Sequence, residues 1–86
     1  DVLFIMDKLA HASLVDGVLA SNARWKRFRH NDVSHLTQLL RQHRASHPHT
    51  PVWVVTESLF SMDGDLAPLN DLVAVCQAYD AFIYLD

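Results

Sequence analysis

The sequence predicts an α/β fold built on a parallel sheet, with the order β-α-β-α-β-α-β. Three short apolar runs are typical of buried strands, a fourth run with two aromatic residues is a short strand candidate, and the stretches between the runs carry apolar residues at helical spacing. No tight hairpin signal separates any two of the runs. Strands that alternate with helices pair in parallel through right-handed crossovers, so one continuous sheet is expected.

The four predicted strands are rich in β-branched and aromatic residues. They comprise residues 2–6, 25–28, 52–56 and 82–85. Residue types of this kind fit the pleated surface of a sheet, and runs of four or five of them bounded by polar residues indicate strands. The second run lies inside a basic stretch, residues 24–29. We expect a strand there with an apolar face formed by Trp25 and Phe28 and a solvated basic face.

The three intervening helices are predicted from their ends and their apolar stripes. His30, Asn31 and Asp32 supply N-cap side chains for the second helix, whose end carries Arg41 to Arg44, where cations favour the helix dipole. Residues 45–51 are expected to form a surface linker, and Pro68 suits the first turn of the third helix. The stripes are Leu14, Val15, Val18 and Leu19; then Val33, Leu36, Leu39 and Leu40; then Leu69, Leu72, Val73, Val75, Cys76 and Tyr79.

Both ends of the sequence adjoin predicted strands. Asp1 stands directly before the first apolar run, and Asp86 stands directly after the last. Natural domains usually start and stop in exposed polar segments. We therefore expect residues 1–86 to be a fragment of a larger domain, with no internal boundary and only marginal stability by itself.

Composition argues against several classes of protein. The formal net charge is −3, and residues 24–29 form the one basic stretch, which leaves nucleic-acid binding as a weak alternative. No apolar run approaches the roughly 20 residues that a membrane span needs, and no signal-peptide pattern is present. We expect a cytoplasmic protein that binds neither nucleic acid nor membrane.

Histidine and cysteine give no sign of a metal site. His43, His47 and His49 are close in sequence but have no cysteine or carboxylate beside them. Cys76 is the one cysteine and falls on an apolar helix stripe, so a buried structural thiol is expected. A Ser-His-Asp triad is weakly supported, because no Gly-x-Ser-x-Gly elbow occurs.

Polar residues follow three of the predicted strands. Asp7 and His11 follow the first strand, and Asp86 ends the fourth. The carboxyl ends of parallel strands share one edge, where open α/β sheets bind ligands. Each residue also has an ordinary role as a helix cap or turn residue, which the residue types alone leave open. After the third strand come Glu57, Ser58, Ser61, Asp63, Gly64 and Asp65, with Gly64 suited to a tight turn.

Three segments together resemble the α-oxoamine synthase family, whose members are pyridoxal 5'-phosphate (PLP) enzymes of the aspartate aminotransferase fold. The segments are residues 7–14 (Asp-Lys-Leu-Ala-His-Ala-Ser-Leu), 28–32 (Phe-Arg-His-Asn-Asp) and 57–69, which contains Ser-Met-Asp-Gly-Asp-Leu-Ala-Pro-Leu. They occur in the family's order and spacing across nearly the whole chain. The resemblance implies a segment of the PLP-binding large domain of a fold-type I transferase.

The resemblance also implies an activity. The chain is most similar to the branch that joins L-alanine to a pimeloyl thioester, on coenzyme A or a carrier protein, with loss of CO2 in biotin biosynthesis. Glycine C-acetyltransferase, 5-aminolevulinate synthase and serine palmitoyltransferase share much of the pattern, and related α-oxoamine synthases of this kind remain alternatives. A homodimer is implied for the full-length protein. A non-catalytic α/β interaction module is the alternative from another class.

The resemblance assigns roles to four residues. His11 matches the histidine that stacks on the cofactor's pyridine ring and faces the amino-acid substrate. Ser61 matches a serine near the cofactor's phenolic oxygen, and Asp86 matches the aspartate that pairs with the pyridine nitrogen. Glu57 matches a recurrent glutamate on the active-site side. No metal ligand is implied.

The chain departs from the family pattern in what it lacks. Its two lysines, Lys8 and Lys26, do not match the Schiff-base lysine, and no glycine-rich phosphate loop is present. Ser58 stands where relatives often have glycine. The segment alone is therefore expected to be inactive, even if the full-length protein is an enzyme.

Overall fold

A computed structural model describes residues 2–8, 16–17, 20–21, 23–56 and 69–85, and it confirms the predicted α/β class. Described residues 16–17 and 20 are helical, whereas Pro68 and all four residues of the first predicted apolar stripe lie outside the described residues. The strands are β1 (Leu3–Asp7), β2 (Arg24–Phe28), β3 (Val52–Thr56) and β4 (Phe82–Leu85), and the helices are α2 (Val33–Ser46) and α3 (Leu69–Ala78).

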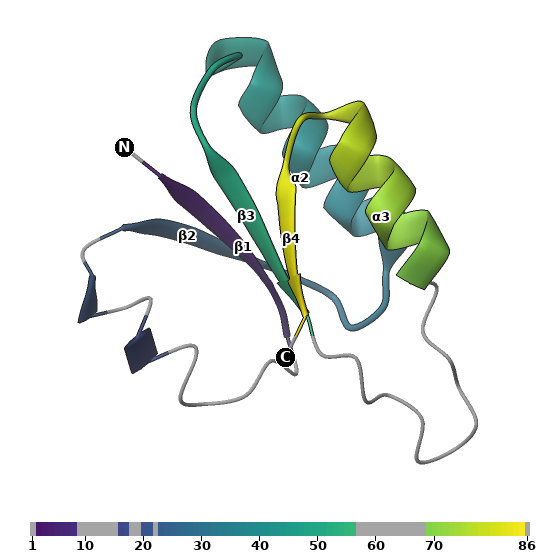
Figure 1. Cartoon of the computed structure of the whole chain (residues 1–86), viewed down its shortest axis with the longest axis horizontal. Coiled ribbons are helices and arrows are strands. Elements are labelled where there is room, and N and C mark those ends of the chain that lie inside the picture. Colours follow the sequence, from purple (N-terminus) through teal and green to yellow (C-terminus); the bar gives the residue numbers. More distant parts are fainter. Residues whose placement is uncertain (1, 9–15, 18–19, 22, 57–68, 86) are drawn as a thin grey trace.

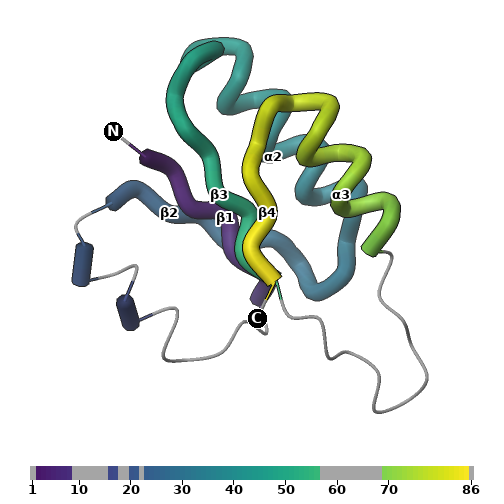
Figure 2. Tube along the Cα trace, in the orientation of Figure 1, coloured from purple at the N-terminus to yellow at the C-terminus, as the bar shows by residue number. Residues whose placement is uncertain are grey.

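The four strands form one parallel sheet in the order β2-β1-β3-β4. Helix α2 connects β2 to β3 across β1, as Figure 2 shows along the chain. The register sets the strand ends: Met6 of β1 pairs with Val55 of β3, and Val55 pairs with Tyr84 of β4. The carboxyl ends of β1, β3 and β4 therefore lie level at one edge of the sheet (Figure 1).

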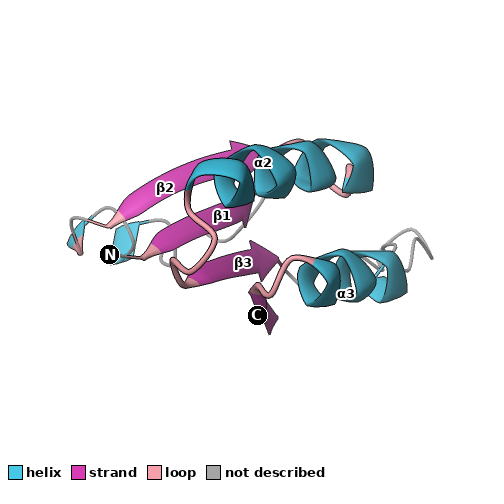
Figure 3. Cartoon of the chain, turned by 90° about the horizontal axis from the view of Figure 1, so that it is seen from above, coloured by secondary structure: helices cyan, strands magenta, loops and turns pink. Residues whose placement is uncertain are grey.

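Both helices cover the same face of the sheet. Figure 3 shows the strands as one layer with α2 and α3 side by side as a second layer. Alternate residues of β1 and β3 point to this face because successive side chains of a strand point to opposite sides. The buried core between the layers consists of Leu3, Ile5, Phe28, Leu36, Leu40, Val52, Val54, Leu72 and Cys76.

The opposite face carries a row of aromatic side chains. Trp25, Phe4, Trp53 and Phe82 stand in one register row across the four strands, and the rings of Trp53 and Phe82 stack with centroids 4.8 Å apart. Trp25 is 45% exposed and Phe82 55% exposed. Parallel sheets are usually covered on both faces. This exposed row agrees with the expectation of marginal stability, which stays a prediction.

The prediction that Trp25 and Phe28 share one apolar face of β2 is wrong. Phe28 is buried against the helices, whereas Trp25 lies on the aromatic face. The two residues are three positions apart in β2, so the two-residue period of a strand places them on opposite faces.

Several element ends differ from the sequence prediction by one or two residues. Strand β1 extends to Asp7, and β2 begins at Arg24. Helix α2 continues to Ser46, where the backbone N–H of His47 donates to the His43 carbonyl at 2.8 Å. The linker after α2 is therefore shorter than residues 45–51. Cys76 is buried as predicted, and desolvation raises the pKa of its thiol to about 11.

Arg44 joins the end of α2 to the end of α3. Its Nε donates to the carbonyl of Tyr79 at 2.8 Å, and one terminal nitrogen donates to that of Asp80 at 3.0 Å. The other terminal nitrogen donates to the carbonyls of His47 at 3.1 Å and Thr50 at 2.6 Å. One planar guanidinium thus binds backbone oxygens from two separate turns, a geometry that lysine does not reproduce.

Arg44→Met is expected to lower the free energy of unfolding by about 2 kcal/mol, because it leaves partly buried carbonyls without a charged donor. Arg41→Met, on an exposed position of the same helix, is the matched control and is expected to change little. Denaturant unfolding measures both. Equal effects of the two substitutions would contradict this role for Arg44.

His43 is a buried histidine on the inner side of α2. It is 7% exposed and stacks on His47 with ring centroids 4.8 Å apart. Its Nε2 atom is buried and has no hydrogen-bond partner among the described residues. Burial first, and then the nearby charges of His47, Arg44, Lys26 and Arg24, hold the pKa of His43 below its ordinary value of 6.5.

This pKa gives stability a defined pH dependence. The unfolded chain takes up a proton on His43 near pH 6.5, whereas the folded chain takes it up only at lower pH, so stability is lost as the pH falls below 6.5. His43→Leu is expected to reduce this loss, measured as denaturant midpoints on either side of that pH. The backbone hydrogen bond from His35 holds the pKa of Asp32 below its ordinary value of 3.8, so that carboxyl does not contribute to the change near pH 6.5. An unchanged pH profile in His43→Leu, matching that of the exposed control His49→Leu, would refute the assignment.

Candidate active site at the carboxyl edge of the sheet

The four predicted site residues His11, Glu57, Ser61 and Asp86 lie outside the described residues, so their roles stay predictions. The strands that lead to them are described. Strand β3 ends directly before Glu57, and β4 ends directly before Asp86. Strand β1 ends four residues before His11. Their parallel register means that the chain enters all three segments from the same edge of the sheet.

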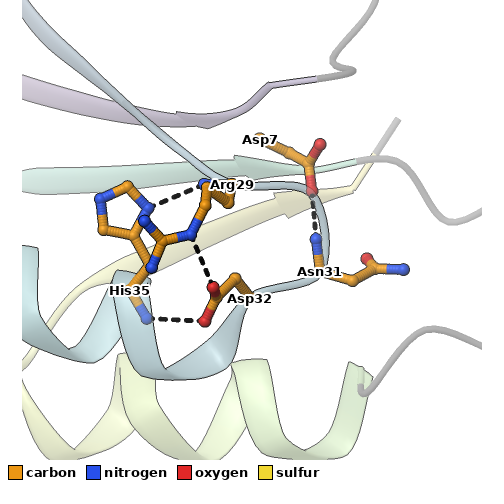
Figure 4. A network of polar contacts seen from close by, with 5 residues as sticks. All are labelled: Asp7, Arg29, Asn31, Asp32 and His35. Atoms are coloured by element: carbon orange, nitrogen blue, oxygen red, sulfur yellow. Dashed lines mark hydrogen bonds and ion pairs between the residues drawn. The ribbon is translucent and has the colours of Figure 1, made fainter.

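A buried carboxylate marks this edge. Asp7, the last residue of β1, is 0% exposed. Its Oδ2 accepts a hydrogen bond from the backbone N–H of Asn31 at 3.1 Å, which Figure 4 shows. Its Oδ1 lies 3.0 Å from Nδ1 of His30. An ionised carboxylate only accepts, so Nδ1 of His30 is the donor in this contact.

His30 and Asn31 therefore do not act as the helix caps that the sequence suggested. Asp32 alone is the N-cap of α2, accepting from the backbone N–H of His35 at 2.9 Å. Asn31 has a φ of 54°, a left-handed conformation in which asparagine is one of the more tolerated residues. That conformation turns the chain between β2 and α2 and directs the Asn31 N–H toward Asp7.

Side chains hold the same turn from its outer side. Arg29 Nε donates to Asp32 at 2.8 Å, and the Arg29 backbone N–H donates to Nδ1 of His35 at 2.8 Å (Figure 4). The hydrogen bond from the His35 backbone, followed by that from Arg29, lowers the pKa of Asp32. The turn is thus anchored at the start of α2 and to the end of β1.

Two further polar atoms are buried without a hydrogen-bond partner among the described residues. They are Oγ1 of Thr56, at the end of β3, and Oδ1 of Asn31. The β1–β3 register offset places Thr56 level with Asp7. Sequence reasoning missed Thr56, because a threonine that ends a β-branched strand is ordinary strand chemistry. The described residues thus line the base of this edge with a carboxylate, an amide and a hydroxyl.

Other kinds of site find no support in the described part of the chain. No group of three or more metal-binding side chains occurs among those residues. The described helices include none that is long and apolar enough to cross a bilayer. Arg24 and Lys26, from the basic stretch on which the weak nucleic-acid alternative rests, are exposed on β2, and nothing tests that alternative.

Comparison with known proteins identifies relatives of the whole segment. The model of the family described as aminotransferase class I and II matches residues 2–86. The 8-amino-7-oxononanoate synthase of Acidithiobacillus ferrooxidans is 49% identical over 80 residues, which cover 93% of this chain and 20% of the relative. The enzyme of the same name from Haemophilus ducreyi is 44% identical over 88 residues, covering 98% of this chain and 22% of the relative.

Solved structures of related proteins are similar to this chain over nearly its whole length. A structure described as SPT with PLP internal aldimine has a TM-score of 0.86 and 38% identity, covering 99% of this chain and 21% of that chain. Sphingomonas wittichii serine palmitoyltransferase has a TM-score of 0.85 and 38% identity, covering 98% and 20%. These likenesses confirm the resemblance to α-oxoamine synthases and the fold-type I large-domain topology.

The chain spans about a fifth of the length of the relatives and structures that it matches. Its family model nevertheless covers all but the first residue. The parallel sheet, the order of its strands and the polar edge all agree with that match. The chain belongs to the aminotransferase class I and II family.

Proposed function

We propose that this chain is a segment of a PLP-dependent acyltransferase that condenses an amino acid with an acyl thioester and releases CO2. The observation that carries the proposal is the register of β1, β3 and β4. It brings the chain to one edge directly before Glu57 and Asp86 and four residues before His11, with Ser61 four residues after Glu57. Family membership and the relatives' names support the same chemistry.

The polar atoms at this edge fit a polar cofactor. Burying a hydroxyl or an amide oxygen without a hydrogen bond costs free energy, and both Thr56 Oγ1 and Asn31 Oδ1 are buried in this way among the described residues. Such atoms are expected where bound groups complete the hydrogen bonding. The neighbouring segments add an imidazole, hydroxyls and carboxylates, the groups that a protonated pyridine and a phenolic oxygen require.

Each proposed side chain has a separate task. PLP, when bound, supplies an electron sink for negative charge beside the amino-acid nitrogen. Asp86 holds a proton on the pyridine nitrogen, because a nearby carboxylate favours the charged form. His11 would stack on the ring and face the amino-acid carboxylate, as the resemblance implies. Ser61 would contact the phenolic oxygen, and Glu57 would belong to the same site.

The proposed substrates are L-alanine and a pimeloyl thioester, on coenzyme A or a carrier protein, which places the reaction in biotin biosynthesis. The names of relatives at 44–49% identity support this choice. The serine palmitoyltransferase structures at 38% identity favour the second candidate, a related α-oxoamine synthase such as glycine C-acetyltransferase or 5-aminolevulinate synthase. A homodimer, which the resemblance implies, and a cytoplasmic location, which the composition led us to expect, are part of the proposal.

The full-length protein is expected to show an absorbance band of lysine-bound cofactor that disappears after borohydride reduction and dialysis. It is expected to release coenzyme A from pimeloyl-coenzyme A with L-alanine more efficiently than with glycine or L-serine. Residues 1–86 alone are expected to show neither property, because Lys8 and Lys26 do not match the Schiff-base lysine. Absence of the band in the full-length protein would overturn the proposal and favour a non-catalytic interaction module.

A matched pair of histidine variants tests the site itself. His11→Ala is expected to lower kcat by about 100-fold, the scale for loss of a positioned catalytic group. His49→Ala, in the exposed turn before β3, is expected to leave kcat unchanged. A preference for glycine or L-serine with the His11 effect intact would move the assignment to the second candidate.

A further inference from the structure

We propose that Asp7 is a positioning residue that fixes the point from which the His11 segment leaves the sheet, through its hydrogen bonds to His30 and Asn31. The inference rests on the proposed function insofar as His11 acts at the cofactor. The contacts that carry it are independent of that function. They join β1 to a turn 23 and 24 residues further along the chain.

The hydrogen bonds of Asp7 to His30 and Asn31 form a clamp, and the burial of Asp7 makes this clamp specific. A carboxylate with 0% exposure is costly unless donors surround it, and its two oxygens bind two different donors. Oδ2 binds a backbone N–H, whose position the left-handed φ of Asn31 sets. Oδ1 binds an imidazole nitrogen. An apolar residue at position 7 would leave both donors without this acceptor.

The turn that binds Asp7 is itself connected to β2 and to α2. The turn that carries His30 and Asn31 begins at Phe28 in β2 and ends at the Asp32 cap of α2. The backbone N–H of Lys8 donates to the Phe28 carbonyl at 3.0 Å, just beyond the end of β1. The chain is therefore held at Asp7 by its side chain and at Lys8 by its backbone.

Distance along the chain links this anchor to the proposed site. His11 lies four residues after Asp7, so the two Cα atoms are at most about 14 Å apart at the maximal reach of an extended chain. A misplacement of about 1 Å at a catalytic group is enough to reduce rates strongly. The anchor therefore affects catalysis through geometry, without contact between Asp7 and the substrate.

The test uses the full-length protein with two variants of the clamp and one control. Asp7→Asn keeps the size of the side chain and replaces one acceptor oxygen with a donor. His30→Phe removes the imidazole donor. Its side chain is 34% exposed, whereas that of Asp7 is fully buried, so this variant keeps the test available if Asp7→Asn fails to fold. Arg44→Met destabilises the opposite end of α2 and serves as the control for general loss of stability.

The first readout does not need the cofactor. Amide hydrogen exchange of the peptide covering residues 8–14 is expected to be about tenfold faster in Asp7→Asn and His30→Phe than in the wild-type protein without cofactor. Arg44→Met is expected to leave this peptide unchanged. Unchanged exchange in both clamp variants would overturn the inference, whatever the activity of the protein.

The second readout reports the site. Both clamp variants are expected to lose about 10- to 100-fold in kcat, the scale of loss for a catalytic group misplaced by about 1 Å, and to change the visible circular dichroism of the bound cofactor. Arg44→Met is expected to lower the melting temperature without either change. The same kcat loss in Arg44→Met would overturn the positioning role. Absence of any cofactor band in the wild type would instead refute the proposed function.

Discussion

Parallel pairing of β1 with both β2 and β3 is the constraint on which the rest of this structure depends. It sends the β2–β3 connection back across the sheet, so α2 passes over β1, and α2 packs beside α3 on one face. It also gathers the carboxyl ends of the strands at one edge. Asp7 and Thr56, which end separate strands, lie level at this edge for this reason, although they are distant in sequence.

The polar edge shows how that constraint becomes a candidate site. Asp7 is buried at the end of β1 and bound by two donors from the β2–α2 turn. Thr56 stands level with it at the end of β3. Buried polar groups of this kind are tolerated where they hold a geometry or meet a ligand. The edge therefore combines a fixed anchor with hydrogen-bonding atoms that a bound group can complete.

The sequence predicted the fold well because each element has a local signal. The β-branched run of β3 and the stripe of Leu36 and Leu40 in α2 each point to one kind of structure. Sequence-based prediction failed for side chains whose hydrogen-bond partners are distant in the sequence. Nothing local indicates that His30 and Asn31 bind Asp7 rather than cap α2, or that Arg44 binds carbonyls 35 and 36 residues away. The predicted roles of His11, Glu57, Ser61 and Asp86 came from family resemblance, because residue types alone left ordinary structural roles open.

In the proposed function, the segments that follow the strands meet at one PLP ring. Isotope-edited NMR of the full-length protein, which reports the protonation state of the pyridine nitrogen, tests this proposal. We expect a protonated nitrogen in the wild type and loss of that proton in Asp86→Asn, with Asp71→Asn, an exposed position in α3, behaving as the wild type. A nitrogen that remains protonated in Asp86→Asn would contradict the proposed role of Asp86, because the carboxylate that follows β4 would then not hold the proton on the ring.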